Sequence, residues 1–146
     1  MGSKGVTPPQ RSGRRHRSRP RERMFELLGT TREHPTAARV HETLQEELPR
    51  LSLGTVYRNL EILVSEGKIE AVSNPHGPTR YDGNPSPHHH FICEGCGGIE
   101  DIELRLPAGL TERVRRKYRV TATRVRVDFY GLCRSCTDRN LTQPIR

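Results

Sequence analysis

Two C-x-x-C pairs constrain this chain more than any other feature. Cys93 and Cys96 form the first pair, Cys133 and Cys136 form the second, and 36 residues separate the two pairs. Four thiolates in tetrahedral geometry are typical of a structural Zn(II) site. The sequence therefore predicts that one zinc ion joins the two pairs and stabilises the fold. Free buried cysteines or a redox pair are the alternatives.

The low apolar content agrees with a fold that needs such a metal. The chain has 146 residues, of which 32% are hydrophobic and 5% aromatic, so one large core is not expected. No apolar run reaches the length of a membrane span, and the N-terminus lacks the apolar segment of a secretory signal. We therefore expect no membrane association and a cytoplasmic location, where thiols stay reduced and bind metal.

Positive charge is concentrated at the N-terminus. Residues 1–23 contain eight basic residues and one acidic residue, which gives them a net charge of +7, against +8 for the whole chain. A basic segment attached to a nearly neutral remainder is typical of proteins that bind nucleic acid. We interpret residues 1–17 as a flexible basic arm that contacts DNA. A disordered leader that only increases solubility is the alternative.

The pattern over residues 18–82 predicts three helices followed by a hairpin. Pro20, Thr36 and Ser52 stand near the predicted helix starts, and apolar residues follow each of them at spacings of three and four. Two short strands around an NPHGP turn would complete a winged helix-turn-helix, whose third helix enters the major groove of double-stranded DNA. The exposed residues expected on that helix are Thr55, Tyr57, Arg58 and Asn59, and the expected phosphate contacts are Arg21, Arg50 and Arg80.

The second half of the chain has a different pattern. Residues 83–87 read GNPSP, which we interpret as a hinge, and residues 88–146 predict a small α/β domain. Its expected elements are strands over 88–93 and 99–104, an amphipathic helix over 107–118 and an alternating strand over 121–132. We therefore expect an α+β protein in which the second domain carries the structural zinc.

A second group of metal-ligating residues surrounds the first C-x-x-C pair. Side chains alternate along a strand, so His88 and His90 share one face and can meet Asp101 on the next strand. Imidazoles with a carboxylate suit Fe(II), Mn(II) or Zn(II). A solvent-exposed histidine run is the alternative. Non-haem iron oxygenases use similar ligands, but residues 88–146 are too few for their β-barrel-sized domain, so we expect no enzymatic activity.

Six sequence motifs occur in one order between residues 34 and 136. They are HPTAARVHETL (34–44), LSLGTVYRNLEIL (51–63), RYD (80–82), HHHFICEGCG (88–97), IED (99–101) and YGLCRSC (130–136). In these motifs the chain resembles the ferric uptake regulator family of bacterial metal-dependent repressors. The resemblance implies a homodimer that binds operator DNA, with residues 88–146 as the dimerisation domain. It also places Tyr57 and Arg58 at the family's DNA-facing pair.

The resemblance further implies a regulatory metal at the hinge. Its ligands would be His34, Asp82, His88, His90 and Asp101. One ion held by both domains fixes the angle between them, and a dimer must present its recognition helices about one DNA turn (~34 Å) apart. Metal binding is therefore expected to select the DNA-binding conformation, and no organic substrate is expected.

The two carboxylates in this set resemble the peroxide regulator branch of the family. In that branch Fe(II) at the site reacts with hydrogen peroxide, a ligand histidine is oxidised and DNA is released; the candidates here are His34 and His88. All four cysteines are assigned to zinc, so redox sensing would have to act through the regulatory metal. Mn(II) fits the same ligands without peroxide chemistry. A repressor of iron, manganese or zinc uptake is therefore the alternative.

The chain departs from the family pattern in two places. The family's Thr-Pro-Gln-Arg in the first helix reads Ser18-Arg19-Pro20-Arg21, where only the last residue matches well. Many members have a histidine before the last C-x-x-C pair that serves an additional metal site, and this chain has Arg124-Val125-Arg126 there. We therefore predict no third metal site, although His89 and Glu103 are possible weak ligands.

Overall fold

The computed structural model describes residues 18–84 and 86–141 and has the mixed helix and sheet content of an α+β protein. Its elements are α1 (Arg19–Thr30), α2 (Ala37–Gln45), α3 (Leu53–Ser65), β1 (Glu70–Val72), β2 (Arg80–Asp82), β3 (His89–Cys93), β4 (Ile99–Ile102), α4 (Leu110–Tyr118), β5 (Asp128–Gly131) and α5 (Arg134–Leu141). The predicted basic arm over residues 1–17 lies outside the described residues. No helix in the described part of the chain is long and apolar enough to cross a membrane.

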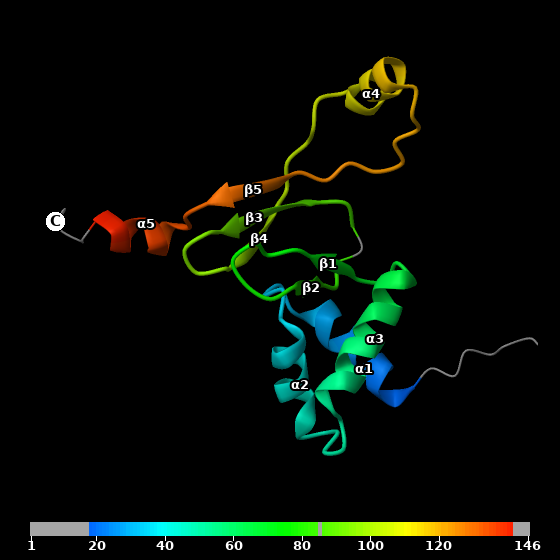
Figure 1. Ribbon diagram of the computed structural model, residues 1–146, viewed down its shortest axis with the longest axis vertical. Helices are drawn as coiled ribbons and strands as arrows, with labels where there is room; N and C mark the ends of the chain where they lie inside the picture. Colours follow the sequence, from blue (N-terminus) through cyan, green and yellow to red (C-terminus); the bar gives the residue numbers. More distant parts are fainter. Residues whose placement is uncertain (1–17, 85, 142–146) are drawn as a thin grey trace, which may run out of the picture.

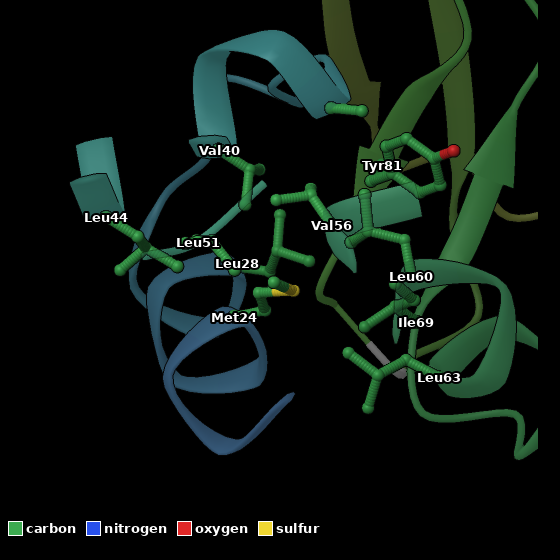
Figure 2. Close-up of a cluster of buried hydrophobic side chains, with 11 residues drawn as sticks. Met24, Leu28, Val40, Leu44, Leu51, Val56, Leu60, Leu63, Ile69 and Tyr81 are labelled. Atoms are coloured by element: carbon green, nitrogen blue, oxygen red, sulfur yellow. The ribbon is translucent and has the colours of Figure 1, made fainter. Parts of the chain in front are cut away.

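The first three helices pack around one apolar core, as Figure 2 shows. Thr36 and Ser52 cap α2 and α3: their side chains accept hydrogen bonds from the backbone N–H groups of Arg39 at 3.1 Å and Thr55 at 3.2 Å. These two helices therefore begin where the sequence predicts. The buried side chains of the core are Met24, Leu28, Ala37, Val40, Leu44, Leu51, Val56, Leu60, Leu63, Ile69 and Tyr81.

The β1–β2 hairpin lies beside the segment that precedes α2. The two strands are antiparallel, and Thr36 forms a β-bridge with Arg80 of β2. The backbone N–H of Tyr81 also donates to the carbonyl of Pro35 at 3.0 Å. These contacts bring His34 to the end of β2, where Asp82 lies.

The second sheet has the order β4-β3-β5. β3 is antiparallel to β4, which places His90 opposite Asp101, and parallel to β5, which places His90 opposite Asp128. A small apolar cluster of Val72, Ile92 and Ile99 joins this sheet to β1 of the hairpin. Figure 1 shows the hairpin lying between the three-helix core and the second sheet.

The strands expected over 88–93 and 99–104 are observed at His89–Cys93 and Ile99–Ile102, and two other elements differ more from the expectation. The strand predicted over residues 121–132 forms only at Asp128–Gly131, because within the described residues only that part pairs with β3. The helix predicted over 107–118 begins at Leu110, and none of its side chains is buried. Figure 1 shows why: α4 stands away from the remainder of the molecule on two long connections.

Candidate metal centres

Two groups of side chains bring metal-ligating atoms together in the described part of the chain. One contains the four cysteines and the other contains three histidines and two aspartates. Within each group the ligand atoms all lie within 4.8 Å of one another. The members are Cys93, Cys96, Cys133 and Cys136 in the first group and His34, Asp82, His88, His90 and Asp101 in the second.

The four cysteines come from two turns that the second sheet holds together. Cys93 ends β3 and Cys96 lies in the turn before β4, whereas Cys133 follows β5 and Cys136 lies in α5. The Sγ atoms of Cys96 and Cys133 are 3.9 Å apart. A tetrahedral zinc ion with Zn–S bonds of about 2.3 Å requires sulfur atoms about 3.8 Å apart. The cysteine cluster therefore fits a structural Zn(II).

The pKa values of two of these thiols are shifted in opposite directions. The backbone N–H of Cys133 donates to Cys93 Sγ at 3.2 Å, and this hydrogen bond lowers the pKa of Cys93 to about 6. Burial raises the pKa of Cys136 to about 11, although Arg139 Nη2 lies 2.9 Å from its sulfur. Zinc binds thiolates. Cys93 is therefore ready to bind near neutral pH, whereas zinc must displace the proton of Cys136 to solvent when it binds.

Glycine is required where the first cysteine turn meets the second. A Cβ atom on Gly95 would lie 3.0 Å from Cys136 Sγ and 3.1 Å from a side-chain carbon of Leu132. Gly97 has a φ of +69°, a left-handed conformation that glycine adopts without steric cost. Gly95 therefore lets the two turns approach closely, whereas a Cβ on Gly97 would meet Asn74 rather than the second turn.

The second group takes ligands from both halves of the chain. His34 precedes α2 and Asp82 ends β2, so both come from the half that contains the three helices. His88 precedes β3, His90 lies in β3 and Asp101 lies in β4. Strand pairing places His90 opposite Asp101, as the sequence predicts. The structure thus brings together all five residues that the family resemblance implies.

The ligand atoms of this group are already close to one another. His34 Nε2 lies 2.9 Å from Asp101 Oδ1, and His88 Nε2 lies 2.9 Å from Asp82 Oδ2. His90 Nε2 lies 3.0 Å from His88 Nε2 and 3.4 Å from Asp82 Oδ2. Ligands at right angles around an ion with bonds near 2.1 Å are about 3 Å apart. These separations fit one divalent metal ion.

Unsatisfied polar atoms support the same conclusion. His34 Nε2 and Asp101 Oδ1 are buried and only 2.9 Å apart, but neither has a hydrogen bond of acceptable geometry among the described residues. Buried polar atoms normally have partners, and metal coordination satisfies both of these. Nitrogen and carboxylate donors together suit Fe(II), Mn(II) or Zn(II). The side chain of Asp101 is 26% exposed, which gives the group an opening to solvent.

The environment shifts the pKa values of three of these side chains. Burial lowers the pKa of His34, against the opposing charges of Asp82 and Asp101. Burial acts to raise the pKa of Asp82, but hydrogen bonds from His90 and the Asn84 N–H outweigh it, so that pKa lies below its ordinary value. The group therefore tends to hold a neutral imidazole at His34 and an ionised carboxylate at Asp82, which are the forms that bind metal.

His88 has the opposite shift from His34. Burial acts to lower the pKa of His88, but its hydrogen bond to the Ser86 carbonyl and the charges of Asp82 and Asp101 outweigh this effect and raise the pKa. His88 Nδ1 lies 2.7 Å from that carbonyl oxygen. The contact orients the ring so that Nε2 faces the aspartates. A proton on His88 therefore competes with the metal.

The candidate DNA contacts fall into two sets. Tyr57 and Arg58 are exposed on α3, and Thr55 is half-buried at its first turn. The predicted exposure of Asn59 is wrong: this side chain is 7% exposed, because its Oδ1 accepts a hydrogen bond from Arg21 Nε at 3.1 Å. Its Nδ2 donates to the Thr55 carbonyl at 2.8 Å, so the amide joins α3 to α1.

Arg80 lies half-buried and is directed toward the interior of the molecule. Its Nη2 donates to the Gly97 carbonyl at 3.0 Å and its Nη1 to the His34 carbonyl at 3.4 Å. Asn74 Nδ2 donates to the same Gly97 carbonyl at 3.2 Å. The hairpin therefore contacts both the cysteine turn and the segment that carries His34.

Comparison with known proteins decides the family. The sequence matches the Ferric uptake regulator family over residues 13–130. This chain belongs to that family. It is a metal-responsive regulator, because regulation by metal is the family's shared property and both ligand groups of the structure fit metal ions. Peroxide-responsive repressor PerR from Staphylococcus aureus (strain USA300) is 28% identical over 119 residues, which cover 82% of this chain and 80% of that protein.

Solved structures give the same family. The peroxide stress regulator of Campylobacter jejuni is 30% identical, with a TM-score of 0.70 over 80% of this chain and 88% of that chain. The ferric uptake regulator Fur of Helicobacter pylori has a TM-score of 0.71 at 22% identity, over 82% of this chain and 81% of that chain. The second likeness shows the shared fold.

Sequence reasoning missed the residues that surround the ligands. Asp128 faces His90 from β5, and Arg139 faces Cys136 within α5. The alternating pattern before Cys133 indicated a strand but not its neighbour. Predicting Asp128 as a neighbour of His90 would have required the parallel pairing of β5 with β3, which the sequence pattern does not give.

Proposed function

We propose that this member of the family is a transcriptional repressor that binds operator DNA as a homodimer when Fe(II) or Mn(II) is bound. The regulatory ligands are His34, Asp82, His88, His90 and Asp101. One observation carries the proposal: this cluster takes two ligands from the helical half, and three from the second sheet and the residue just before it. An ion bound there holds the two halves at one angle, and occupancy therefore controls DNA binding.

The helical half is the DNA-binding part in this proposal. Three helices followed by a hairpin match a winged helix-turn-helix over residues 18–82, with residues 83–87 as the hinge and α3 in the major groove. Tyr57 and Arg58 are exposed on α3 and contact bases or phosphates, with Thr55 beside them. Arg21 and Asn59 hydrogen-bond each other, so they orient α3 against α1 as well as lying near the DNA.

The cysteine cluster has a separate role. We assign Cys93, Cys96, Cys133 and Cys136 to a structural zinc that joins β3 to α5 and stabilises the dimerisation domain over residues 88–146. The chain has four cysteines, and this proposal assigns all four to the zinc, so no free thiol is left to sense an oxidant. A response to oxidants must therefore act through the regulatory ligands.

We further propose that this response is to hydrogen peroxide. Bound Fe(II) would activate the peroxide, and the imidazole would supply the two electrons that reduce it. One peroxide oxygen is inserted into a ring C–H bond of His34 or His88, which becomes C–OH, and the other oxygen leaves as water. The relatives named for a peroxide response, from Staphylococcus aureus and Campylobacter jejuni, support this proposal, as do the two aspartates of the site. Loss of one imidazole weakens the bridge between the halves and releases DNA.

The test compares the full chain loaded with Fe(II) and with Mn(II). Each form receives dilute peroxide, and mass spectrometry locates any added oxygen; fluorescence anisotropy follows release from operator DNA. We expect an added oxygen on His34 or His88, and DNA release, only with iron. Metal-dependent DNA binding without oxidation in either form would identify an uptake repressor instead. If operator affinity is the same with and without the metal, or is unchanged in His90→Ala, the repressor mechanism itself is refuted.

A further inference from the structure

His90 presents its two ring nitrogens to different carboxylates. The ring is fully buried in β3. Its Nε2 lies among the proposed metal ligands, 3.4 Å from Asp82 Oδ2. Its Nδ1 lies 3.7 Å from Asp128 Oδ1, on β5. Asp128 is not one of the five ligands, so it approaches His90 from outside the metal cluster.

Neither facing atom makes a hydrogen bond within the described residues. His90 Nδ1 and Asp128 Oδ1 are both buried, and the charged group close to Oδ1 besides His90 is Arg126, whose Nε is ion-paired with it at 3.1 Å and leaves the oxygen a second lone pair. Strand pairing fixes the contact, because β5 places Asp128 directly opposite His90 in the parallel register. A histidine nitrogen and a carboxylate oxygen are complementary once the nitrogen carries a proton. The sheet thus holds two groups ready to form one hydrogen bond.

Metal binding determines which ring nitrogen of His90 carries the proton. A neutral imidazole carries one ring proton, so coordination through Nε2 requires that proton to be on Nδ1. The Nδ1–H then points at Asp128, which can accept it after a small approach. Such a carboxylate fixes the tautomer and orientation of a ligand histidine and increases its basicity.

An arginine holds the carboxylate in this position. Arg126 Nη2 donates to Asp128 Oδ2 at 3.2 Å, and its Nε lies 3.1 Å from Oδ1. The same guanidinium reaches back to β1, where Nη1 donates to Glu70 Oε2 at 3.3 Å. Glu70 also accepts from Arg124 Nη1 at 2.5 Å. A line of contacts therefore runs from His90 through Asp128 and Arg126 to the hairpin.

We propose that Asp128 is a positioning residue for the regulatory metal: it accepts the Nδ1 proton of His90 when Nε2 coordinates, and Arg126 keeps its carboxylate in reach. The proposal rests on the assignment of His90 as a regulatory ligand. Asp128 does not touch the ion. Its effect is on how tightly and in what orientation His90 binds the ion.

The experiment measures Co(II) binding by the full chain with zinc already in the cysteine site. Asp128→Asn keeps the shape of the side chain but weakens the acceptor, and Asp128→Ala removes it. We expect the Co(II) dissociation constant to rise about 10- to 100-fold, more for alanine than for asparagine, with altered Co(II) absorption bands. Asp128→Glu keeps the carboxylate and should recover part of the affinity.

The matched control is Glu112→Gln, which removes a carboxylate paired with an arginine, Arg115 at 3.0 Å, far from both metal groups in α4. Its Co(II) affinity and spectrum should equal those of the unchanged chain. His90→Ala separates the positioning role of Asp128 from the assignment of His90 as a regulatory ligand. If it abolishes Co(II) binding while Asp128→Asn and Asp128→Ala change neither affinity nor spectrum, the role of Asp128 is overturned and the proposed function stands. If His90→Ala binds Co(II) as the unchanged chain does, the ligand assignment itself fails.

Discussion

At the scale of single residues, His34 shows how a ligand position is made. Its φ is +48°, in the left-handed region that non-glycine residues rarely occupy. The hydrogen bonds of Arg80 to the His34 carbonyl and of Tyr81 N–H to the Pro35 carbonyl hold the backbone there. This conformation directs Nε2 to within 2.9 Å of Asp101 Oδ1. Local backbone strain thus accompanies the ligand that joins the two halves.

The strain predicts an unusual order of stability for two variants. His34→Ala and His34→Gly both remove the ligand, but only glycine adopts a φ of +48° without steric cost. We therefore expect His34→Gly to be the more stable, by about 1 kcal/mol, although glycine is ordinarily the less stable of the two. Urea unfolding of the zinc-loaded variants without other metal measures this. If alanine is the more stable variant, the left-handed conformation at residue 34 is refuted.

Some single-residue features could be predicted from the sequence and others could not. The five regulatory ligands followed from the family motifs, and for His88, His90 and Asp101 also from the two-residue period of a strand. The burial of Asn59 did not follow, because its partner Arg21 lies 38 residues earlier in the chain. A helix pattern shows which side is apolar, but it does not show which polar side chain another helix covers.

At the scale of elements, α4 buries no side chain in the described part of the molecule, and the segment between α4 and β5 is attached to it through ion pairs with Glu70. Tyr118 and Val120 are 62% and 49% exposed. The alternating pattern before Cys133 predicted a strand over residues 121–132, and only Asp128–Gly131 pair with β3. A strand needs a hydrogen-bonded neighbour. We therefore predict that a second copy of the chain covers this surface in the proposed homodimer.

This interpretation predicts that one tyrosine matters for assembly and another does not. Tyr118→Asp places a charge on the exposed face of α4, and we expect the variant to sediment as a monomer. Tyr57→Asp makes the same change on α3, where Tyr57 is 45% exposed, and it should remain a dimer but bind operator DNA more weakly. Analytical ultracentrifugation distinguishes the two. A dimeric Tyr118→Asp would exclude α4 from the interface.

At the scale of the whole molecule, the halves are connected by other contacts besides the regulatory ligands, including the hydrogen bonds of Arg80 and Asn74 to the Gly97 carbonyl. Val72 packs with Ile92 and Ile99, and ion pairs join Glu70 to the segment before β5. None of these contacts could be predicted from the sequence, because each joins residues whose local patterns are satisfied within their own half. The regulatory ligands therefore lie within an existing junction, which the metal strengthens.

The junction predicts how metal binding depends on pH. The pKa of His88 is raised and that of His34 is lowered, so His88 is the first of the two to hold a proton as pH falls. A protonated imidazole cannot coordinate, so Mn(II) affinity should be full above the raised pKa of His88 and fall about tenfold per pH unit below it. Mn(II) titrations followed by electron paramagnetic resonance measure this. His88→Ala should bind more weakly with a flatter pH dependence; an unchanged slope would assign the proton elsewhere.

Arg80 of the hairpin has two candidate roles: a contact with DNA phosphate, and hydrogen bonds that stabilise the junction between the two halves. The sequence predicts a phosphate contact, but the guanidinium donates to the carbonyls of Gly97 and His34, which belong to the two metal centres. Arg80→Ala removes donors from both carbonyls, so we expect it to reduce the free energy of unfolding by about 1–3 kcal/mol and to weaken Mn(II) binding. Arg58→Ala, on the exposed face of α3, should weaken operator binding and leave unfolding unchanged.

Urea unfolding, Mn(II) titration and the salt dependence of operator binding separate the two roles of Arg80. A pure phosphate contact would leave stability and metal affinity unchanged in Arg80→Ala and reduce the slope of log affinity against log salt by about 1. Arg80→Lys sharpens the comparison. Lysine keeps the charge that a phosphate needs, but one ammonium group does not reproduce the forked geometry that reaches two carbonyls. If the junction is the site of action, metal affinity should stay reduced in Arg80→Lys, and the salt slope should be the same for arginine, alanine and lysine. If a phosphate is the partner, lysine should keep the slope that alanine loses.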